Sequence, residues 1–262
     1  MVEKSLSVIT VNRNNKYGLI NTISSLSDQL FNQWSQLIVD SASTDLEFDF
    51  WSKIANNKIN FISEKDAGVY DGMNKGVLMT SGDYLFFLNS GDRLIDSESL
   101  QYLTSYMGDF DLIYGDVIFE NDSDLKNFNY PDELSLEYMI CYGLPHQAIL
   151  IKRELHERIG GYSTNYKIIS DWVFFMESLF FAQASYKHVP KSITFFDGKG
   201  MSQQAANTSL IISEQLDYIS KRFPTYISFF KQNSPYVKKY FRTIPRWRRP
   251  FSRLLFNLFN KL

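Results

Sequence analysis

An apolar run that ends abruptly in small and acidic residues constrains the fold of this chain most strongly. Five consecutive large residues, Tyr84 to Leu88, are followed by Asn-Ser-Gly-Asp at positions 89–92. A half-buried strand would alternate polar with apolar residues, so this run predicts a strand that is buried on both faces. In an open α/β sheet, ligands bind at the carboxyl ends of such strands, where Asn89 and Asp92 would lie. The alternative is a polar turn in which Asp92 caps the next helix.

Charge is distributed unevenly along the chain. From Tyr218 onward there are 11 Lys and Arg and no Asp or Glu, which leaves 16 basic and 29 acidic residues before it. An acidic body argues against nucleic acid as the main ligand. The single cysteine, Cys141, excludes an intramolecular disulfide and fits a reducing cytoplasm. We expect no signal peptide and no membrane-spanning segment, because no apolar stretch is long enough.

Strand and helix patterns alternate through the first half of the chain. The β-branched run Leu6 to Val11 ends in a polar turn, after which apolar residues recur at helical spacing. Further strands are expected at 36–39, 59–62, 84–88 and 111–114, and helices at 46–56, 69–77 and 97–107. This alternation indicates a largely parallel sheet covered on both faces.

The pattern is looser after Glu120. Residues 121–131 suggest a polar loop, followed by a strand at 148–151 and by a helix over 152–159 that ends at Gly160. An aromatic-rich helix is expected over 172–182. Ser170 or Asp171 before it would serve either as its N-cap or as a site residue.

The C-terminal segment predicts an amphipathic helix. Apolar residues fall at helical spacing from Phe251 to Leu262, cations lie between them, and Pro250 suits the first turn. With Trp247 and the two arginines that follow it, this segment resembles an interfacial membrane helix. The alternative is a helix docked on the acidic body.

The polar residues at strand ends could bind a sugar nucleotide. A pyrophosphate needs a divalent metal (Mn²⁺ or Mg²⁺) or Lys and Arg side chains, so Asp92 could hold the metal and Lys75 could neutralise phosphate. Asp40, at the end of the second strand, could accept a hydrogen bond from a base. Transfer with inversion also needs a carboxylate that deprotonates the attacking hydroxyl, for which Asp171 is the candidate.

The order of these motifs resembles the family 2 glycosyltransferases, an inverting group with the GT-A fold. The resemblance covers about Ser5 to Asp197. It is carried by the segments Ser-Val-Ile-Thr-Val-Asn at 7–12, Val-Asp-Ser-Ala-Ser-Thr-Asp at 39–45, Gly-Asp-Tyr to Asp at 82–92, Pro-His-Gln at 145–147, Gly-Gly-Tyr at 160–162 and Ser-Asp-Trp at 170–172. The segments at 63–76 and 87–92 resemble most closely a bacterial branch that works in capsule, colanic-acid-like and O-antigen synthesis.

The resemblance implies a set of site residues. Donor contacts would come from Val11, Asn12, Asp40, Asp66, Lys75, Asn89 and Ser90, and acceptor or diphosphate contacts from His146 and Trp172. Asp171 would be the base and Asp92 the metal ligand. Two motifs depart from the common pattern. Acidic residues usually stand where this chain has Asn89 and Gly91, which leaves Asp92 as the only carboxylate there, and the second aspartate that often follows Asp40 is Ser41, so Asp40 is the better candidate for base recognition.

We therefore expect a GT-A catalytic domain over 1–217, with a nucleotide-binding half to about 117 and an acceptor half over 118–217, and a basic helical tail over 218–262. The expected enzyme moves a hexose or N-acetylhexosamine from a nucleotide donor, with UDP favoured, to a lipid-diphosphate-linked glycan in surface polysaccharide synthesis. The tail would place it on the anionic inner face of the bacterial cytoplasmic membrane. A homo-oligomer is left open.

Two other functions compete with this expectation. A sugar-nucleotide pyrophosphorylase would carry a glycine-rich basic loop after the first strand, whereas Asn12 to Lys16 has no glycine. A catalytically degenerate sugar-nucleotide-binding protein would fit the loss of acidic residues at positions 89 and 91. A dinucleotide-dependent oxidoreductase is disfavoured because no GxGxxG motif follows a strand.

Overall fold

The structure is a computed structural model of the 262-residue chain, and it describes residues 4–46, 48–121, 124–198, 200 and 205–225. The chain divides into two compact units, one formed by residues 1–133 and 144–199 and the other by residues 134–143 and 200–262. All the elements that carry the candidate site belong to the first unit.

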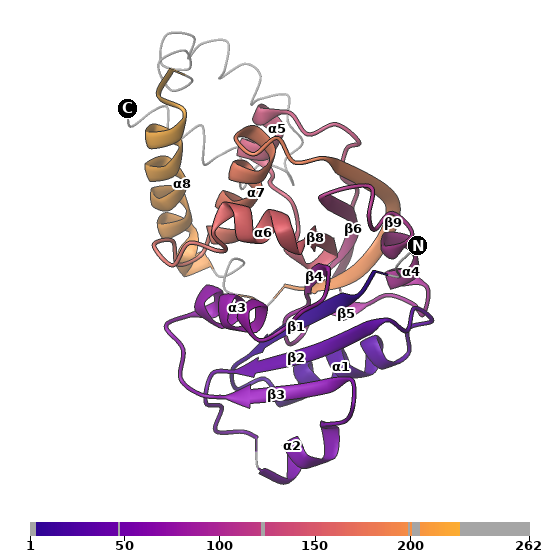
Figure 1. Cartoon of the computed structure of the whole chain (residues 1–262). Helices are drawn as coiled ribbons and strands as arrows, with labels where there is room; N and C mark the ends of the chain where they lie inside the picture. Colours follow the sequence, from indigo (N-terminus) through magenta and orange to yellow (C-terminus); the bar gives the residue numbers. More distant parts are fainter. Residues whose placement is uncertain (1–3, 47, 122–123, 199, 201–204, 226–262) are drawn as a thin grey trace. The chain divides into compact units, whose positions relative to one another are not determined.

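The first unit alternates strands and helices along most of its length (Figure 1). Its elements are β1 (Leu6–Asn12), α1 (Lys16–Ser27), β2 (Trp34–Asp40), α2 (Phe48–Ile54), β3 (Ile59–Ser63), α3 (Val69–Leu78), β4 (Tyr84–Phe87), β5 (Arg93–Leu94), α4 (Ser99–Thr104), β6 (Leu112–Asn121), β7 (Asp124–Phe128), η1 (His146–Ala148), β8 (Ile149–Lys152), α6 (Arg153–Ile159), α7 (Ser170–Phe180) and β9 (Tyr186–Asp197). Every strand expected from the sequence is present within two residues of its predicted bounds, except that β6 continues to Asn121, well beyond the predicted end at 114.

The strands form one sheet in the order β3-β2-β1-β4-β8-β6-β9-β5, with β7 paired to β6. The first four strands are parallel, and Asn12 and Asp40 stand opposite each other where β1 and β2 end. Beyond β4 the sheet is mixed, because β8 runs antiparallel to both β4 and β6, whereas β6 and β9 pair in parallel. The expectation of a largely parallel sheet is therefore confirmed only in part. The predicted polar loop over 121–131 is wrong, since β6 and β7 form an antiparallel hairpin there.

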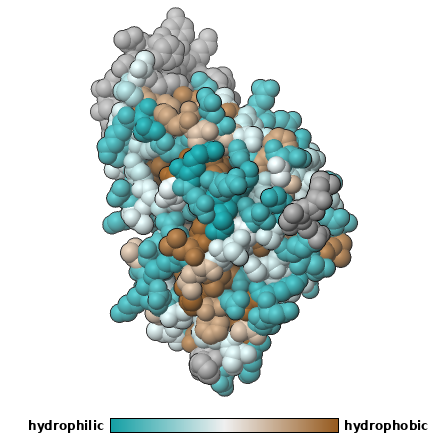
Figure 2. Space-filling view, viewed as in Figure 1, coloured by the Kyte–Doolittle hydropathy of each residue, from teal (hydrophilic) through white to brown (hydrophobic). Residues whose placement is uncertain are grey.

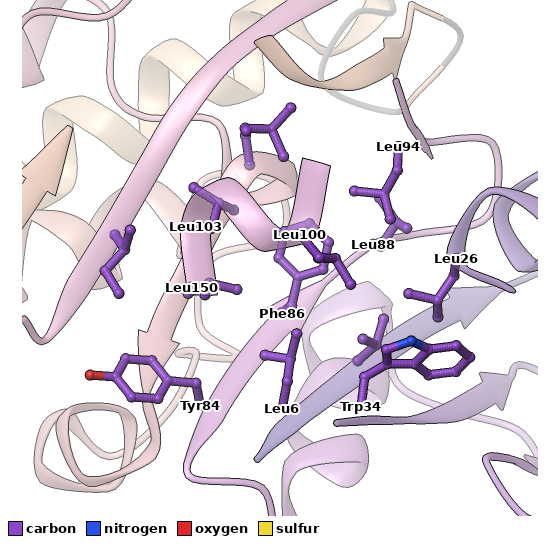
Figure 3. Close-up of a cluster of buried hydrophobic side chains, with 14 of the residues drawn as sticks. Leu6, Leu26, Trp34, Tyr84, Phe86, Leu88, Leu94, Leu100, Leu103 and Leu150 are labelled. Atoms are coloured by element: carbon purple, nitrogen blue, oxygen red, sulfur yellow. The ribbon is translucent and has the colours of Figure 1, made fainter. Parts of the chain in front are cut away.

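Two helical layers cover the sheet, and alternate residues of β1 show which layer covers which face. Leu6 and Val8 belong to a buried cluster that also contains side chains from α1 and α4 (Figure 3). On the other face, a Cβ added to Gly76 of α3 would lie 2.4 Å from Ile9 Cγ2. In β4, Phe86 joins the first cluster, whereas Phe87 lies against Tyr162 with ring centroids 5.1 Å apart. The expected strand buried on both faces is confirmed.

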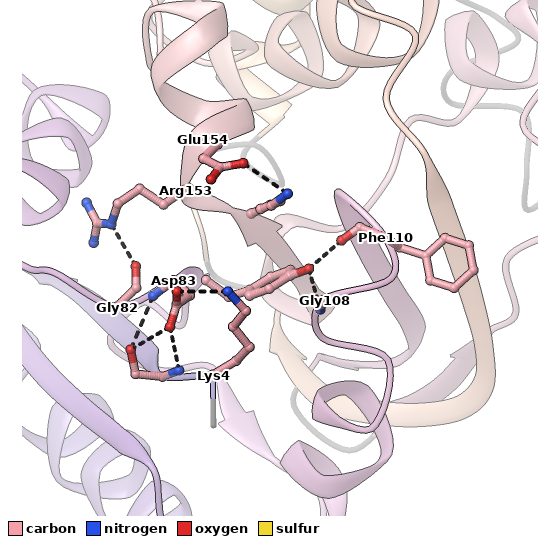
Figure 4. Close-up of polar contacts among 10 residues, drawn as sticks. Lys4, Gly82, Asp83, Gly108, Phe110, Arg153 and Glu154 are labelled. Carbon is pink, nitrogen blue, oxygen red and sulfur yellow. Dashed lines mark hydrogen bonds and ion pairs between the residues drawn. The ribbon is translucent and has the colours of Figure 1, made fainter. Parts of the chain in front are cut away.

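The amino end of β4 is anchored by a separate set of polar contacts (Figure 4). Asp83 accepts hydrogen bonds from the backbone N–H and the hydroxyl of Ser5, at 2.9 and 3.0 Å, and from Lys4 at 3.3 Å. Arg153 Nε donates to the carbonyl of Gly82 at 2.7 Å. These bonds fix the register at which β4 enters the sheet, and therefore where its carboxyl end lies.

The second unit contains α5 (Leu136–Cys141) and α8 (Thr208–Arg222) among its described residues. Ser135 caps α5 by accepting a hydrogen bond from the N–H of Tyr138. Helix α8 runs through the boundary that we placed between 217 and 218. The predicted amphipathic segment over 250–262 lies outside the described residues. Within the part of the chain that the structure describes, no helix is long and apolar enough to cross a membrane.

Polar residues cover most of the face drawn in Figure 2, and apolar residues gather on it in the region where Figure 1 draws β2 and β3.

Candidate active site

The carboxyl ends of β1, β2 and β3 are joined through one buried carboxylate. Asp40, which is fully buried, accepts hydrogen bonds from Asn12 Nδ2 at 2.7 Å, the Ser43 N–H at 2.9 Å and the Ser63 hydroxyl at 2.6 Å. Both of its oxygens are therefore already bonded within the protein. In this structure Asp40 links the segments that follow β1, β2 and β3. Its predicted contact with a base stays a prediction.

Val11 and Asp66 both lie close to Gly72 in the first turn of α3. A Cβ added to Gly72 would lie 3.2 Å from Val11 Cγ1 and 3.3 Å from Asp66 Oδ2. Asp66 Oδ1 accepts the N–H of Gly68 at 3.1 Å, whereas Oδ2 is buried without a hydrogen-bond partner among the described residues. A buried acceptor left unpaired is costly. The oxygen is enclosed by the protein in this arrangement, and the predicted donor role of Asp66 stays a prediction.

Lys75 lies on α3, but its ammonium group is bonded locally. Nζ is 2.9 Å from Glu64 Oε1 and 3.6 Å from Asp71 Oδ2, and it donates to the carbonyl of Lys65 at 3.2 Å. The bond to Glu64 is the main cause that raises the pKa of Lys75. Neutralising a phosphate would require Lys75 to leave Glu64, and its role there stays a prediction.

The turn after β4 is held by β1 and α1. The Ser90 N–H donates to the carbonyl of Val11 at 3.1 Å, and the Thr22 hydroxyl donates to the carbonyl of Asp92 at 2.7 Å. Gly91 has a φ of 107°, a conformation that side chains rarely adopt, and a Cβ there would lie 2.7 Å from Asp197 Oδ2. Any side chain at position 91 would therefore be strained, and the carboxylate of Asp197 would have to shift to make room for it. Helix α4 has Glu98 at its N-cap, so the alternative of Asp92 as a helix cap is wrong.

Asp92 is buried and close to a second carboxylate. It is 5% exposed, and its Oδ1 accepts the N–H of Asp197 at 3.0 Å. Burial raises the pKa of Asp92 from 3.8 to about 7, and the charge of Asp197 adds to this, against the opposing effects of that hydrogen bond and of His146. A divalent cation would reverse the preference of this carboxyl for its neutral form.

The two carboxylates and the oxygens of a bound pyrophosphate would form an oxygen donor set that suits Mn²⁺ or Mg²⁺. No group of three or more His, Cys, Asp or Glu that could hold a metal occurs among the described residues. The fit to a metal therefore rests on Asp92, with Asp197 beside it.

Asp171 is the centre of a hydrogen-bonded group. Its Oδ2 lies 2.8 Å from His146 Nδ1, and its Oδ1 accepts the Tyr70 hydroxyl at 2.7 Å. Ile169 occupies the N-cap of α7 and makes no capping side-chain bond, so the alternative of Ser170 or Asp171 as the cap is wrong. The side chain of Asp171 points to His146 and Tyr70 instead.

The ionised forms of His146 and Asp171 stabilise each other. Burial acts to raise the pKa of Asp171, but the bonds from His146 and Tyr70 outweigh it, and the pKa is lowered. Burial likewise acts to lower the pKa of His146, but Asp171 and the charge of Asp92 outweigh it, and the pKa is raised. His146 Nε2 lies 3.2 Å from Asn89 Nδ2. The structure therefore links Asn89, His146 and Asp171, which were predicted separately.

Trp172, next to Asp171, is 7% exposed. Its predicted contact with the acceptor stays a prediction.

The sequence reasoning missed two residues of this site. Tyr70 lies in the quoted segment 63–76 but was not assigned a role, and its hydroxyl bonds Asp171 across 101 positions. Asp197 marked only the end of the resemblance, and it meets Asp92 across 105 positions. A tyrosine in the first turn of a helix and a lone aspartate at the end of a strand carry no signal by themselves, because only the fold brings them to the site.

The family model and two of the relatives that match this chain are described as glycosyltransferases. Residues 7–178 match the family model described as "Glycosyl transferase family 2". A "PGL/p-HBAD biosynthesis glycosyltransferase" of Mycobacterium bovis is 31% identical over 159 residues, which cover 58% of this chain and 60% of the relative. The match thus spans about three fifths of that relative's length. An "Uncharacterized glycosyltransferase" of Haemophilus influenzae is 22% identical over 276 residues, covering 98% of this chain and 90% of its own.

Solved structures show the same fold. The S. aureus TarS 1–349 structure in complex with UDP-GlcNAc superposes with a TM-score of 0.66 at 16% identity, covering 94% of this chain and 78% of that one. The mannosyltransferase PcManGT from Pyrobaculum calidifontis, in complex with GDP-Man and Mn²⁺, gives a TM-score of 0.64 at 12% identity, covering 84% and 64%. Because the family model matches more than half of its length, this chain belongs to glycosyl transferase family 2, with a GT-A-like α/β fold.

Proposed function

We propose that this protein transfers a sugar from a nucleotide-diphosphate donor to a hydroxyl group of a glycan acceptor, with inversion at the anomeric carbon. The observation that carries the proposal is the Asp171 carboxylate, which His146 and Tyr70 hold at 2.8 and 2.7 Å in the unit that also contains the Asn89 to Asp92 turn. Family membership supports transferase chemistry, and a UDP-sugar donor is supported by the UDP-GlcNAc bound to TarS.

The reaction needs one base. The acceptor oxygen attacks the anomeric carbon and forms the new C–O bond as its proton passes to Asp171. The bond between the anomeric carbon and the phosphate oxygen breaks, and its electron pair leaves with the nucleoside diphosphate. A positioned carboxylate of this kind contributes about 10²- to 10⁴-fold to a rate.

The proposal includes a divalent metal, Mn²⁺ or Mg²⁺. Asp92 would hold it, with Asp197 beside it, and the metal would supply charge stabilisation for the departing diphosphate. The chain's own residues set up this site: β1 and α1 anchor the turn, and burial leaves Asp92 with a proton that a cation can replace.

The test combines donor binding with turnover. Calorimetric titration with UDP, GDP and CMP, each with and without Mn²⁺, should show metal-dependent binding of one nucleotide. Asp171→Asn should abolish transfer and leave that binding nearly unchanged. Normal turnover by the variant would refute the base assignment. Nucleotide binding by the wild type without turnover on any acceptor would favour the degenerate sugar-nucleotide-binding protein instead.

The acceptor and the location extend this proposal. We propose a hexose or N-acetylhexosamine as the sugar and a lipid-diphosphate-linked glycan of a surface polysaccharide, such as capsule or O-antigen, as the acceptor. The basic, apolar segment 247–262 supports attachment to the anionic inner face of the cytoplasmic membrane, because an enzyme bound there stays near a lipid-linked acceptor.

A further inference from the structure

His146 lies between two groups that together determine which of its nitrogens carries the proton. Nδ1 is 2.8 Å from Asp171 Oδ2, and Nε2 is 3.2 Å from Asn89 Nδ2. A neutral imidazole has one donor nitrogen and one acceptor nitrogen, whereas an amide NH₂ group can only donate. An ionised Asp171 can only accept, so Nδ1 of a neutral His146 carries the proton, and Nε2 is then the nitrogen that accepts from Asn89 Nδ2.

The side chain of Asn89 can form a hydrogen bond with either the neutral or the charged form of His146. Its Oδ1 is buried and has no hydrogen-bond partner among the described residues. If the amide turned by half a rotation, Oδ1 would accept a proton from Nε2 of an imidazolium, so the residue serves both forms. A carboxylate at position 89 could only accept, and it would stabilise the imidazolium alone.

We propose that Asn89 and His146 are positioning residues for Asp171: Asn89 fixes the Nδ1–H tautomer of His146, and His146 in turn orients the carboxylate and keeps it ready to accept a proton. This inference rests on the proposed role of Asp171 as the base. Tyr70 fixes the second oxygen of the carboxylate, at 2.7 Å. Among the described residues, two further titratable groups face this arrangement: the charge of Asp92 raises the pKa of His146, and Tyr162 lies near both Tyr70 and Asp171.

The Asn89→Asp variant perturbs this arrangement without adding atoms. The new carboxylate would hold the imidazolium between two anions, and Asp171 bonded to an imidazolium is a weaker base than Asp171 bonded to a neutral imidazole. The active form of the pair, neutral His146 with ionised Asp171, would then be reached only at higher pH. An adjacent opposite charge typically moves such a titration by about one to three pH units.

The first experiment reads the tautomer directly. The ¹⁵N NMR spectrum of protein labelled at its three histidines, with His146→Asn used for assignment, should show His146 protonated on Nδ1 at a pH where it is neutral. Asn89→Asp should show both nitrogens protonated at that same pH. A neutral His146 protonated on Nε2, or an unchanged spectrum in Asn89→Asp, would overturn the inference, and neither result depends on activity.

The second experiment follows the pH dependence of kcat/KM. In Asn89→Asp the acid limb should move up by about one pH unit or more, which gives about fivefold less activity, or a larger loss, at the pH where the wild type is half active. His146→Asn keeps a donor toward Asp171 but cannot titrate, so its kcat should fall while the acid limb moves to lower pH. A merely structural His146 would lower activity and leave the limb in place, which would overturn the inference.

Asn56→Asp is the matched control. Asn56 is exposed, and its Oδ1 accepts the N–H groups of Lys58 and Ile59, a role that a carboxylate can fill. Its profile should match that of the wild type, and folding of every variant is checked by its thermal unfolding. If Asp171→Asn kept full turnover while the tautomer was as expected, the proposed function would fail and the hydrogen-bonded arrangement would stand. The wrong tautomer together with an inactive Asp171→Asn would overturn the inference and leave the proposed function standing.

Discussion

Replacing Asp92 with Asn should stabilise the metal-free protein, and more so as pH rises. Asp92 is 5% exposed, and burial raises its pKa from 3.8 to about 7. Asparagine has nearly the shape of the protonated acid and can still accept the N–H of Asp197, which is 3.0 Å from Oδ1. The substitution therefore removes a titration and keeps the local structure.

The magnitude follows from linkage. Between pH 3.8 and about 7, Asp92 is protonated in the folded state and ionised in the unfolded chain. The free energy of unfolding therefore falls as pH rises through this interval, and it levels off above it. At about 1.4 kcal/mol for each pH unit, the penalty reaches about 4 kcal/mol. Below pH 4 the carboxyl is protonated in both states, and the wild type and the variant should differ least.

The assay is urea unfolding in EDTA, followed by the fluorescence of the four tryptophans, over a range from acid to mildly alkaline pH. The free energy of unfolding of Asp92→Asn minus that of the wild type should grow with pH by an amount on the order of 4 kcal/mol. A difference that stays constant over this range would refute the reasoning.

Asp83, at the other end of β4, is the matched control. The hydrogen bond from the Ser5 N–H is the main cause that lowers the pKa of Asp83 (Figure 4). The contribution of Asp83 to the free energy of unfolding has the opposite pH dependence to that of Asp92. It stabilises the protein above the ordinary pKa of an aspartate, and this stabilisation is lost as pH falls through the lowered pKa. Asp83→Asn should therefore destabilise the protein near neutral pH and converge with the wild type in acid.

Two further predictions concern packing and location. Gly76→Ala should lower the free energy of unfolding by about 1–2 kcal/mol in a urea titration, because its Cβ would lie 2.4 Å from Ile9 Cγ2 in a filled core; Gly72→Ala on the same helix, whose nearest contact would be 3.2 Å, should cost clearly less, and equal costs would contradict the argument. Deleting 250–262 should release the protein from anionic liposomes in a sedimentation assay and leave turnover on a short soluble acceptor intact, whereas binding that survives the deletion or ignores added salt would contradict an interfacial basic helix.

The parallel half of the sheet could be predicted because its signals are local. The run Tyr84 to Leu88 is apolar throughout, and each strand from β1 to β4 is followed by small or polar residues that mark its end. Strand β9 escaped prediction although it is 12 residues long. It contains the exposed Pro190, and its pairing with β6 is interrupted by register shifts near Gly115 and Asp116. Proline cannot donate a hydrogen bond to a neighbouring strand and normally argues against a strand. A prediction from local sequence therefore misses β9, where an irregular stretch of the pairing accommodates the proline.

The candidate site was predictable in its residue types but not in its pairings. Asp171 and His146 were both selected, yet at 25 positions apart nothing in the sequence pairs them, and the helix cap was an equally good role for Asp171. Lys75 was assigned to phosphate from its charge alone, whereas Glu64, 11 positions earlier, holds its ammonium group at 2.9 Å. A side chain's partner is determined by the fold, and the partner determines its chemistry.

The departures from the common family pattern at positions 89 and 91 then have separate physical causes. At position 91 the backbone conformation favours glycine, and a side chain would force Asp197 Oδ2, 2.7 Å from the added Cβ, to shift. At position 89 there is room for a side chain, but the neighbour is His146 Nε2 at 3.2 Å. An acidic residue there would stabilise the imidazolium and weaken Asp171 as a base, whereas an amide can face either form of the ring. The asparagine is therefore explained by the histidine beside it, and a chain without that histidine would have no such reason to avoid a carboxylate at this position.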